Sequence, residues 1–203
     1  MMELYGAGHS RWAKCYWMLK ELGKDFQECP VNFMEGELRS PKFLALNPFG
    51  KMPVLKDGDV TLFESTAILN YLGEKFPESG LTPKGGTVER AYYDQWNSYC
   101  TTELEQPLWR ITKHTVILPE AYRIPADVEL AKKDFAYNAK IMDQQLGTKK
   151  YLVGDRFTAA DITLAYTLGW AIELKLLTPY ANLLRYTKET HSRPAFPEHL
   201  FGK

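Results

Sequence analysis

The first part of the chain alternates short apolar runs with amphipathic stretches, a pattern that predicts strands separated by helices. Strands are expected at residues 2–5 and 26–31, and apolar residues recur at helical spacing over residues 11–22 between them. Ser40-Pro41 predicts the start of a short helix, because serine is a favoured cap and proline fits the first helical turn. The helix between the first two strands makes a parallel pair with a right-handed crossover the expected arrangement.

The stretch from residue 47 to residue 65 predicts a turn, a hairpin and the start of another helix. Asn47-Pro48 ends the preceding helix, and apolar residues at 54–55 and 60–63 form two strand candidates. Asp57-Gly58 joins them, because glycine takes a positive φ without steric cost. A helix over residues 67–76 follows. The resulting order predicts one mixed four-stranded sheet covered by helices, which is the thioredoxin-like arrangement.

The remainder of the chain has a helical pattern and no convincing strand. Prolines and glycines before residue 87 indicate a linker, and helices are expected at residues 88–109 and 127–146. Thr158 and Asp161 have the spacing of a capping box that starts a buried helix, with Phe157 and Ile162 at the staple positions. We therefore expect an α/β domain over residues 1–78, a linker over 79–87 and an all-α domain over 88–203. Core candidates of the helix at 127–146 are Leu130, Phe135, Ile141, Met142 and Leu146.

Composition narrows the class of protein. Lysine plus arginine and aspartate plus glutamate number 25 each, so the formal net charge is zero, which argues against sequence-independent binding of nucleic acid. Three scattered cysteines form no Cys-x-x-Cys pair, and the four histidines lack metal-ligand spacing. The N-terminus lacks the apolar core of a signal peptide, and charges interrupt the longest apolar stretch. We expect a cytoplasmic protein with no metal and no membrane contact.

Several motifs are spread over nearly the whole chain. They are Leu4-Tyr5-Gly6 with Ser10 six residues after Leu4, Gly36-Glu37-Leu38-Arg39, Asn47-Pro48-Phe49-Gly50, Met52-Pro53, Leu62-Phe63-Glu64-Ser65, the capping box with Phe157, and Arg193-Pro194-Ala195-Phe196. Together these motifs resemble the glutathione S-transferase family, and the likeness is closest to its serine-type, phi-like branch. The resemblance implies a thioredoxin-like glutathione-binding domain, a helical domain, a homodimer and a role in detoxification.

The family's reaction is the attack of glutathione thiolate on an electrophile, so the protein must favour the thiolate near neutral pH. By resemblance, Ser10 donates the stabilising hydrogen bond at the junction of a loop and a helix. Local sequence alone favours Ser10 as a helix cap. Tyr5 is the rival donor, because other branches of the family use a tyrosine at the end of the first strand. Its alternative role is that of a packed aromatic at the strand end.

The resemblance also assigns residues to the parts of glutathione. Pro53 is expected in the cis form, which presents the Met52 backbone to the cysteinyl backbone, although X-Pro bonds in general favour trans. Glu64 pairs with the ammonium of the γ-glutamyl end. Ser65, at a helix N-terminus, binds its carboxylate, and capping is a second role for the same hydroxyl.

Two cations and one aromatic residue complete the expected contacts. Arg39 and Lys51 are candidates for the glycine carboxylate, with solvated surface cations as the alternative. Leu38-Arg39 stands where the serine-type branch often has a histidine-lysine pair, so the histidine contact is missing. Phe49 is expected to contact the partner subunit of a homodimer, because an exposed aromatic at a loop tip needs a reason.

The electrophile pocket is expected to be apolar and to draw mainly on the helical half. Cys15 is expected to be buried rather than nucleophilic, and His9 to be a loop residue. Two alternatives to conjugation are glutathione-dependent peroxide reduction or thiol transfer, and a non-catalytic ligand-binding or scaffold role on the same fold. Pocket candidates are Trp12, Tyr99, Trp109 and Trp170.

Overall fold

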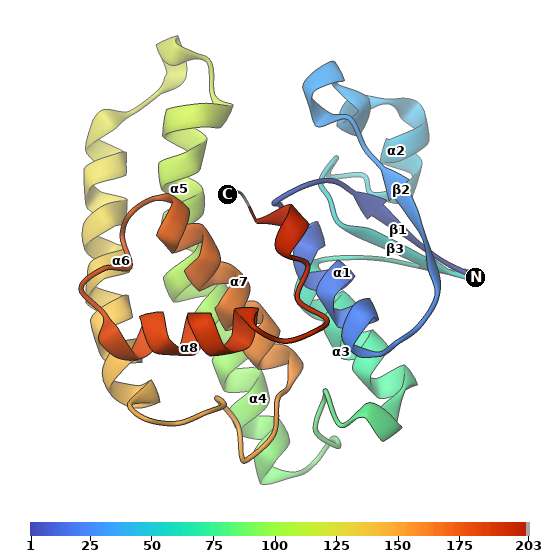
Figure 1. Ribbon diagram of the computed structural model, residues 1–203. Coiled ribbons are helices and arrows are strands. Elements are labelled where there is room, and N and C mark those ends of the chain that lie inside the picture. Colours follow the sequence, from blue (N-terminus) through green and yellow to red (C-terminus); the bar gives the residue numbers. More distant parts are fainter. Residues whose placement is uncertain (202–203) are drawn as a thin grey trace. The chain divides into compact units, whose positions relative to one another are not determined.

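The computed structural model describes residues 1–201 and divides the chain into two units (Figure 1). The first unit comprises Met1–Lys84 and the segment from Arg193 onward, and the second comprises Gly85–Ser192. The boundary lies within the expected linker. The end of the chain differs from the expected division, which gave residues 88–203 to the helical domain. The segment from Arg193 belongs to the first unit because its side chains pack there, as Phe196 does against Trp17.

The first unit contains the four-stranded mixed sheet that the sequence predicts. Its strands are β1 (Met2–Gly6), β2 (Phe26–Pro30), β3 (Val54–Asp57) and β4 (Val60–Phe63), in the spatial order β2-β1-β3-β4. β1 and β2 are parallel, whereas β3 is antiparallel to both β1 and β4. This topology is thioredoxin-like, as expected.

Three helices cover the sheet: α1 (Trp12–Glu21), α2 (Pro41–Leu46) and α3 (Ser65–Lys75). α1 and α3 pack against each other. α2 supplies Phe43 to a separate cluster with Val31 and Val54. The Ser40 hydroxyl caps α2 by accepting from the Phe43 N–H at 3.1 Å, which confirms the predicted helix start.

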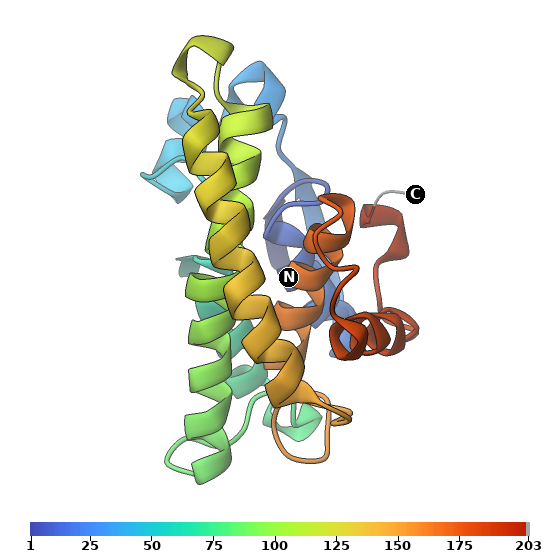
Figure 2. The ribbon, with the colours of Figure 1, turned by 90° about the vertical axis from the view of Figure 1, so that its left-hand side faces the viewer.

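The second unit is helical throughout its regular structure. Its elements are α4 (Val88–Tyr99), a π-helical segment η4 (Cys100–Glu105), α5 (Gln106–Thr112), a second π-helical segment η5 (Lys113–Ile117), a short 3-10 helix η6 (Glu120–Tyr122), α6 (Pro125–Leu146), α7 (Ala159–Glu173) and α8 (Ala181–His191). Figure 2 shows α6 beside the long helical stretch that contains α4 and α5, and Arg110 of α5 binds both Asp127 and Asp134 of α6.

The capping box at the start of α7 is present, with both reciprocal hydrogen bonds between Thr158 and Asp161. Phe157 and Ile162 are buried beside it, as the staple pattern predicts.

The expectation that Leu130 of α6 belongs to the core was wrong, since this side chain is 53% exposed. The buried residues of α6 recur every three or four positions from Val128 through Ala131, and Leu130 falls outside that row. No helix within residues 1–201 is long and apolar enough to cross a membrane.

Candidate active site

Strand register brings three segments of the first unit to one edge of the sheet. Tyr5 of β1 lies opposite Val54 of β3, and Val54 lies opposite Phe63 of β4. The loop after β1, the residue before β3 and the residue after β4 therefore emerge side by side. Adjacent strands are about 4.8 Å apart, so these segments lie within the span of a tripeptide.

Ser10 lies in the first of these segments, directly before α1. Its hydroxyl donates to the Ala7 carbonyl at 2.9 Å and accepts from the Trp12 N–H at 3.3 Å. Its carbonyl accepts from the Ala13 N–H at 2.8 Å. Ser10 therefore supports the start of α1, as a capping residue does. The same hydroxyl can turn its hydrogen from the carbonyl to an anion, because charged acceptors form the stronger hydrogen bond.

Gly6 and Trp12 set the course of the chain between β1 and α1. Gly6 has a φ of 152°, and a Cβ on it would lie 2.3 Å from the Trp12 ring. The Trp12 indole N–H donates to the Leu4 carbonyl at 3.4 Å, and the side chain is only 4% exposed. Most of the Trp12 ring is thus occupied in packing this turn, and little of it is open to a substrate.

Tyr5 lies on the face of β1 opposite to that of Leu4, because side chains alternate along a strand. Leu4 is fully buried, whereas Tyr5 packs with Met52 and Phe43 in the cluster on the α2 side. The Tyr5 hydroxyl donates to Glu3, and this bond together with burial raises the pKa of Tyr5. Its proton is therefore committed to a carboxylate, which favours Ser10 over Tyr5 as the thiolate donor.

The second segment at the sheet edge contains Met52 and Pro53. The bond between them is cis, as expected from the family resemblance. Met52 is half-buried and Pro53 is buried. Within residues 1–201, no hydrogen bond involves the Met52 backbone N–H or C=O. Both groups are available to an extended peptide laid along the start of β3.

Asn47 holds the turn that precedes this segment. Its side-chain amide donates to the Lys51 carbonyl at 2.7 Å, and its side-chain oxygen accepts from the Phe49 N–H at 3.1 Å. Its backbone carbonyl accepts from the Gly50 N–H at 2.9 Å. Asn47 is only 2% exposed, so this residue organises the turn from inside. We missed this role from sequence, where Asn-Pro indicated only the end of a helix.

The two candidate cations flank this turn. The Arg39 guanidinium donates to the Phe49 carbonyl at 3.4 Å, and a Cβ on Gly50 would lie 2.7 Å from it. Gly50 also has a φ of 59°, so glycine is required here on both counts. Arg39 and Lys51 are both exposed. The close approach at Gly50 holds Arg39 beside the turn that carries Lys51.

Glu64 and Ser65 form the third segment, where β4 passes into α3. Glu64 is exposed and has a φ of 70°, a strained value for a residue with a Cβ. This backbone bend starts α3 at once, and Ser65 lies in its first turn with 4% exposure. The first N–H groups of a helix have no partner within the helix, so this end favours an anion.

The Ser65 hydroxyl forms no hydrogen bond within the described part of the chain, and its oxygen is not fully buried. This hydroxyl can therefore reach a ligand at the start of α3.

Cys15 of α1 lies beside this segment, with its sulfur 3.9 Å from the Ser65 carbonyl oxygen. Burial raises the pKa of the Cys15 thiol to about 12, so this cysteine is not a nucleophile near neutral pH. No cluster of metal-binding side chains occurs in residues 1–201.

The remaining pocket candidates belong to the second unit. The Tyr99 hydroxyl donates to the Asn138 carbonyl at 3.1 Å, and burial raises its pKa to about 12. The Trp170 indole N–H donates to Thr112 at 3.2 Å. Trp109 is half-buried in α5. Tyr99 and Trp170 thus hold helices of this unit together through their polar atoms.

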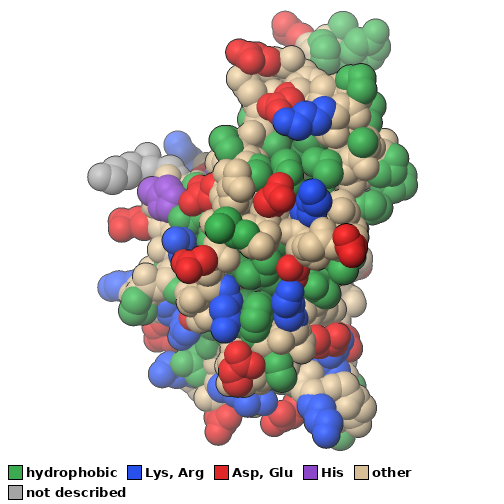
Figure 3. Space-filling view, turned by 90° about the vertical axis from the view of Figure 1, so that its right-hand side faces the viewer, with side chains coloured by type: hydrophobic (Ala, Val, Ile, Leu, Met, Phe, Trp, Pro, Cys, Tyr) green, Lys and Arg blue, Asp and Glu red, His purple; other side chains and the backbone are tan. Residues whose placement is uncertain are grey.

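Phe49 is the exposed aromatic at the tip of the turn. It is 63% exposed, and its ring meets the edge of Phe63 at 5.7 Å between centroids. On the face drawn in Figure 3, basic and acidic side chains are interspersed. That pattern agrees with the formal net charge of zero.

Comparison with known protein families gives matches in both halves of the chain. The model of the glutathione S-transferase N-terminal domain matches residues 1–74. The model of the glutathione S-transferase C-terminal domain matches residues 124–189. The first match contains all three segments at the sheet edge.

Individual relatives agree with the family models. Glutathione S-transferase F10 of Arabidopsis thaliana is 34% identical over 188 residues, which cover 89% of this chain and 87% of the relative. The crystal structure of glutathione transferase F7 from Populus trichocarpa superposes with a TM-score of 0.88 at 26% identity, covering all of both chains. Glutathione S-transferase-I bound with lactoylglutathione gives a TM-score of 0.82 at 29% identity, over 97% of each chain. This chain therefore belongs to the glutathione S-transferase family, with a phi-like pattern, and is a glutathione transferase.

Proposed function

We propose that the protein conjugates the thiolate of glutathione to small hydrophobic electrophiles, and that Ser10 stabilises the thiolate. The observation that carries this proposal is the common sheet edge. It brings together a hydroxyl at a helix start, a free backbone pair at Met52 and the N-terminus of α3. These are the groups needed to bind an extended γ-glutamyl tripeptide around its sulfur.

The energetics support this role for Ser10. A free thiol has a pKa of about 8.5, so it is mostly protonated at neutral pH. A hydrogen bond to an anion contributes roughly 1.5–3 kcal/mol, and a helix N-terminus adds about 0.3–1 kcal/mol. Each pKa unit corresponds to about 1.4 kcal/mol. One hydroxyl at the start of α1 is therefore enough to lower the thiol pKa by one to two units.

Glutathione is oriented by charge at its two ends in this proposal. Glu64 accepts from the γ-glutamyl ammonium, and the Ser65 hydroxyl donates to the adjacent carboxylate at the start of α3. Arg39 and Lys51 attract the glycine carboxylate from the turn at Gly50. Between these ends, the Met52 backbone pairs with the cysteinyl residue. The half-buried Trp109 of the helical unit is our candidate for a contact with the electrophile.

Truncated peptides test the two ends separately. We expect Ser65→Ala to weaken glutathione binding about tenfold, the value of one hydrogen bond to a charged group. Cysteinylglycine, which lacks the γ-glutamyl residue, is expected to bind this variant and the unmodified protein equally. Arg39→Ala is expected to weaken glutathione binding about threefold, in keeping with an exposed ion pair. γ-Glutamylcysteine lacks the glycine carboxylate, so its affinity for Arg39→Ala should equal its affinity for the unmodified protein. Isothermal titration measures each of these affinities, for the variants and for the unmodified protein.

Thr61→Val, on the exposed side of β4, is the matched control because it also removes a hydroxyl from this region. Equal losses for full-length and truncated peptides would refute the assignment of ends. Turnover of glutathione with chlorodinitrobenzene tests the proposed reaction itself. Tight binding of glutathione without turnover would instead indicate a ligand-binding or scaffold protein.

Dimerisation is the second part of the proposal, with Phe49 in the interface. A phenylalanine that is 63% exposed on a rigid turn is suited to insertion into the helical unit of a second copy. We expect Phe49→Ala to raise the dimer dissociation constant at least tenfold, measured by sedimentation velocity over a dilution series. Phe33→Ala removes another exposed ring and serves as the control. An unchanged dimer in Phe49→Ala would remove Phe49 from the interface.

We place the protein in the cytoplasm. Cys15, Cys29 and Cys100 are thiols that form no disulfide within residues 1–201, which suits a reducing compartment. Localisation of a fluorescent fusion of the full chain tests this placement.

A further inference from the structure

The segment from Arg193 to Phe201, which we call the C-terminal strap, is anchored at the end of α1. Arg193 binds the Glu21 carboxylate through Nε and Nη2, each at 2.7 Å. The Trp17 indole N–H donates to the same carboxylate at 2.9 Å. The Glu21 side chain is only 9% exposed. A bidentate ion pair with a largely buried carboxylate fixes the orientation of Arg193 on α1 as well as adding binding energy.

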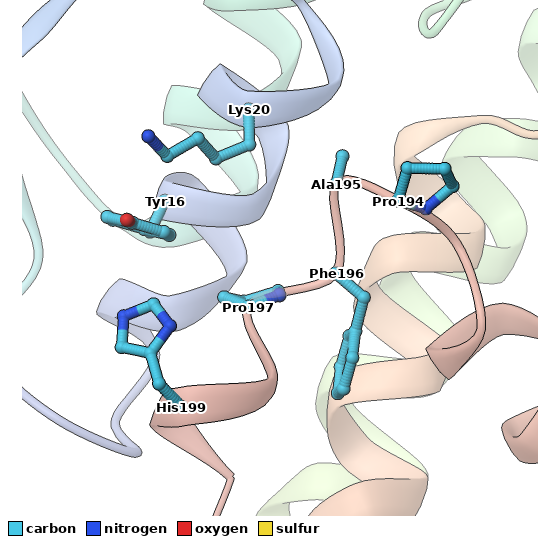
Figure 4. Close-up of a pocket in the computed structure, with 7 residues that line it drawn as sticks. All are labelled: Tyr16, Lys20, Pro194, Ala195, Phe196, Pro197 and His199. Atoms are coloured by element: carbon cyan, nitrogen blue, oxygen red, sulfur yellow. The ribbon is translucent and has the colours of Figure 1, made fainter.

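The middle of the strap packs against α1 with side chains on both of its sides. Figure 4 shows Tyr16, Lys20 and His199 gathered on one side of Pro197, while Phe196 points away on the other. Phe196 meets the Trp17 ring at 5.0 Å, and His199 meets the Tyr16 ring at 5.7 Å. An open groove of about 360 Å³ lies on the Tyr16 side. The strap is therefore attached to successive turns of α1.

The end of the strap reaches the loop that carries Ser10. The Phe201 ring lies 4.8 Å from Phe196 and 4.5 Å from the His9 ring, between centroids. A row of rings thus runs from Trp17 through Phe196 and Phe201 to His9. The last ring of this row belongs to the residue directly before Ser10.

The loop from Ala7 to Ser10 is held within itself by Ser10, whose hydroxyl and N–H donate to the Ala7 and Gly8 carbonyls, each at 2.9 Å. It contains bends and no regular structure. Gly8 has a φ of 54°, and a Cβ on it would meet nothing within 4 Å. A glycine in open space leaves the backbone free to change conformation. The His9 ring gives this loop a large side chain that an outside group can hold.

We propose that Phe201 is a positioning residue for Ser10: its ring packs on His9 and limits the loop to the conformation in which the hydroxyl faces the sulfur. This inference rests on the proposed role of Ser10. Met52, Glu64 and Ser65 come from other segments, so the binding of glutathione itself does not need Phe201. Loss of the ring should therefore lower kcat and raise the pKa of the bound thiol, while KM for glutathione stays nearly constant.

The test compares Phe201→Ala with Phe201→Tyr, which keeps the ring, in the full chain. We expect Phe201→Ala to lower kcat about two- to tenfold, the range set by one aromatic pair. The bound-thiol pKa, measured by ultraviolet titration of thiolate, should rise by a few tenths of a unit or more. In NMR spectra of Phe201→Ala, the His9 ring protons should lose the ring-current shift that the Phe201 ring causes. Phe201→Tyr should restore all three readouts. Phe33→Ala is the matched control.

The outcomes separate this inference from the proposed function. If the unmodified protein binds glutathione with an ordinary thiol pKa, the proposed role of Ser10 fails. If that pKa is low and Phe201→Ala leaves kcat and the pKa unchanged, the positioning role fails. A drop in melting temperature with unchanged kcat per folded molecule would show a purely structural strap and would also overturn the inference.

Discussion

Ser10→Ala is expected to raise the pKa of enzyme-bound glutathione by about one to two units, since one hydrogen bond to the thiolate contributes roughly 1.5–3 kcal/mol. At about pH 6.5, two units below the pKa of a free thiol, kcat/KM should fall about 10- to 100-fold. The physical reason is that removal of the hydroxyl leaves the start of α1 as the main stabiliser of the anion. Ultraviolet titration of the bound thiolate measures the pKa, and a conjugation assay measures the rate.

The pH dependence of this loss has a definite sign. A lowered thiol pKa increases the thiolate fraction most at pH values between the lowered and the ordinary pKa. Above the ordinary pKa, both proteins hold mainly thiolate. The rate difference between Ser10→Ala and the unmodified protein should therefore shrink as the pH rises past about 8.5. A loss that stays constant over the whole range would indicate damage to binding geometry instead.

Tyr5→Phe is the matched comparison, because it also removes one hydroxyl near β1. We expect its bound-thiol pKa to be unchanged, since the Tyr5 hydroxyl donates to Glu3 on the α2 side of the sheet. Stability of each variant is measured alongside, because Ser10 also supports the start of α1 through the Trp12 N–H. If Tyr5→Phe alone raised the thiol pKa, Tyr5 would be the donor and our assignment would be wrong.

The choice between Ser10 and Tyr5 marks a limit of the sequence. Both residues lie near the end of the first strand, and family resemblance allows a serine or a tyrosine there. Alternation along β1 places Leu4 and Tyr5 on opposite faces of the sheet, but the sequence does not say which of these faces α2 covers. The structure shows that α2 lies on the Tyr5 face, because Phe43 of α2 and Tyr5 pack in one cluster. The hydrogen bond to Glu3 then occupies the Tyr5 proton.

The hairpin turn and the helix caps were predictable from the sequence, because the residues that specify each of them lie within a few positions of one another. Gly58 has a φ of 60° in the hairpin, as the Asp-Gly pair indicated. Ser40 caps α2 and Thr158 opens α7, as their spacing indicated. Each of these signals depends on the fixed geometry of a turn or a helix end, which a short sequence is enough to specify.

Contacts between residues far apart in the sequence were not predictable from the same patterns. Arg193 binds Glu21, which is 172 positions earlier in the chain, and nothing near either residue announces the pair. The assignment of residues 88–203 to one helical domain missed this return. Leu130 shows a related failure, because an apolar residue at roughly helical spacing can still lie off the buried row. Asn47 was underestimated since its partners are backbone groups, whose positions follow only from the fold.

The second large effect is expected for Asp161, the acid of the capping box. Its carboxylate is fully buried. One oxygen accepts from the Leu152 N–H at 2.8 Å and the Tyr186 hydroxyl at 2.6 Å. The other accepts from the Thr158 N–H at 2.8 Å and the Thr158 hydroxyl at 3.0 Å. One side chain thus joins the start of α7, the loop before it and α8.

Asp161→Ala removes both acceptor oxygens and all four hydrogen bonds at once, and it leaves buried donors without partners. Each such loss costs about 1–3 kcal/mol, so we expect the free energy of unfolding to fall by about 4 kcal/mol or more. A domain has a total stability of only about 5–15 kcal/mol, so the melting temperature should drop sharply. Urea denaturation followed by circular dichroism measures the change.

Asp161→Asn should recover less than half of this loss. Its amide oxygen can serve one pair of donors, but its amide nitrogen then faces the other pair with hydrogens of its own. Asp155→Ala is the matched control, because Asp155 is an exposed aspartate in the loop directly before α7. We expect it to change stability by less than about 0.5 kcal/mol. If Asp161→Ala were as mild as Asp155→Ala, the four hydrogen bonds would not hold these segments together. The strong packing of α7, from Ile162 through Ala171, would then account for the stability of this unit without the box.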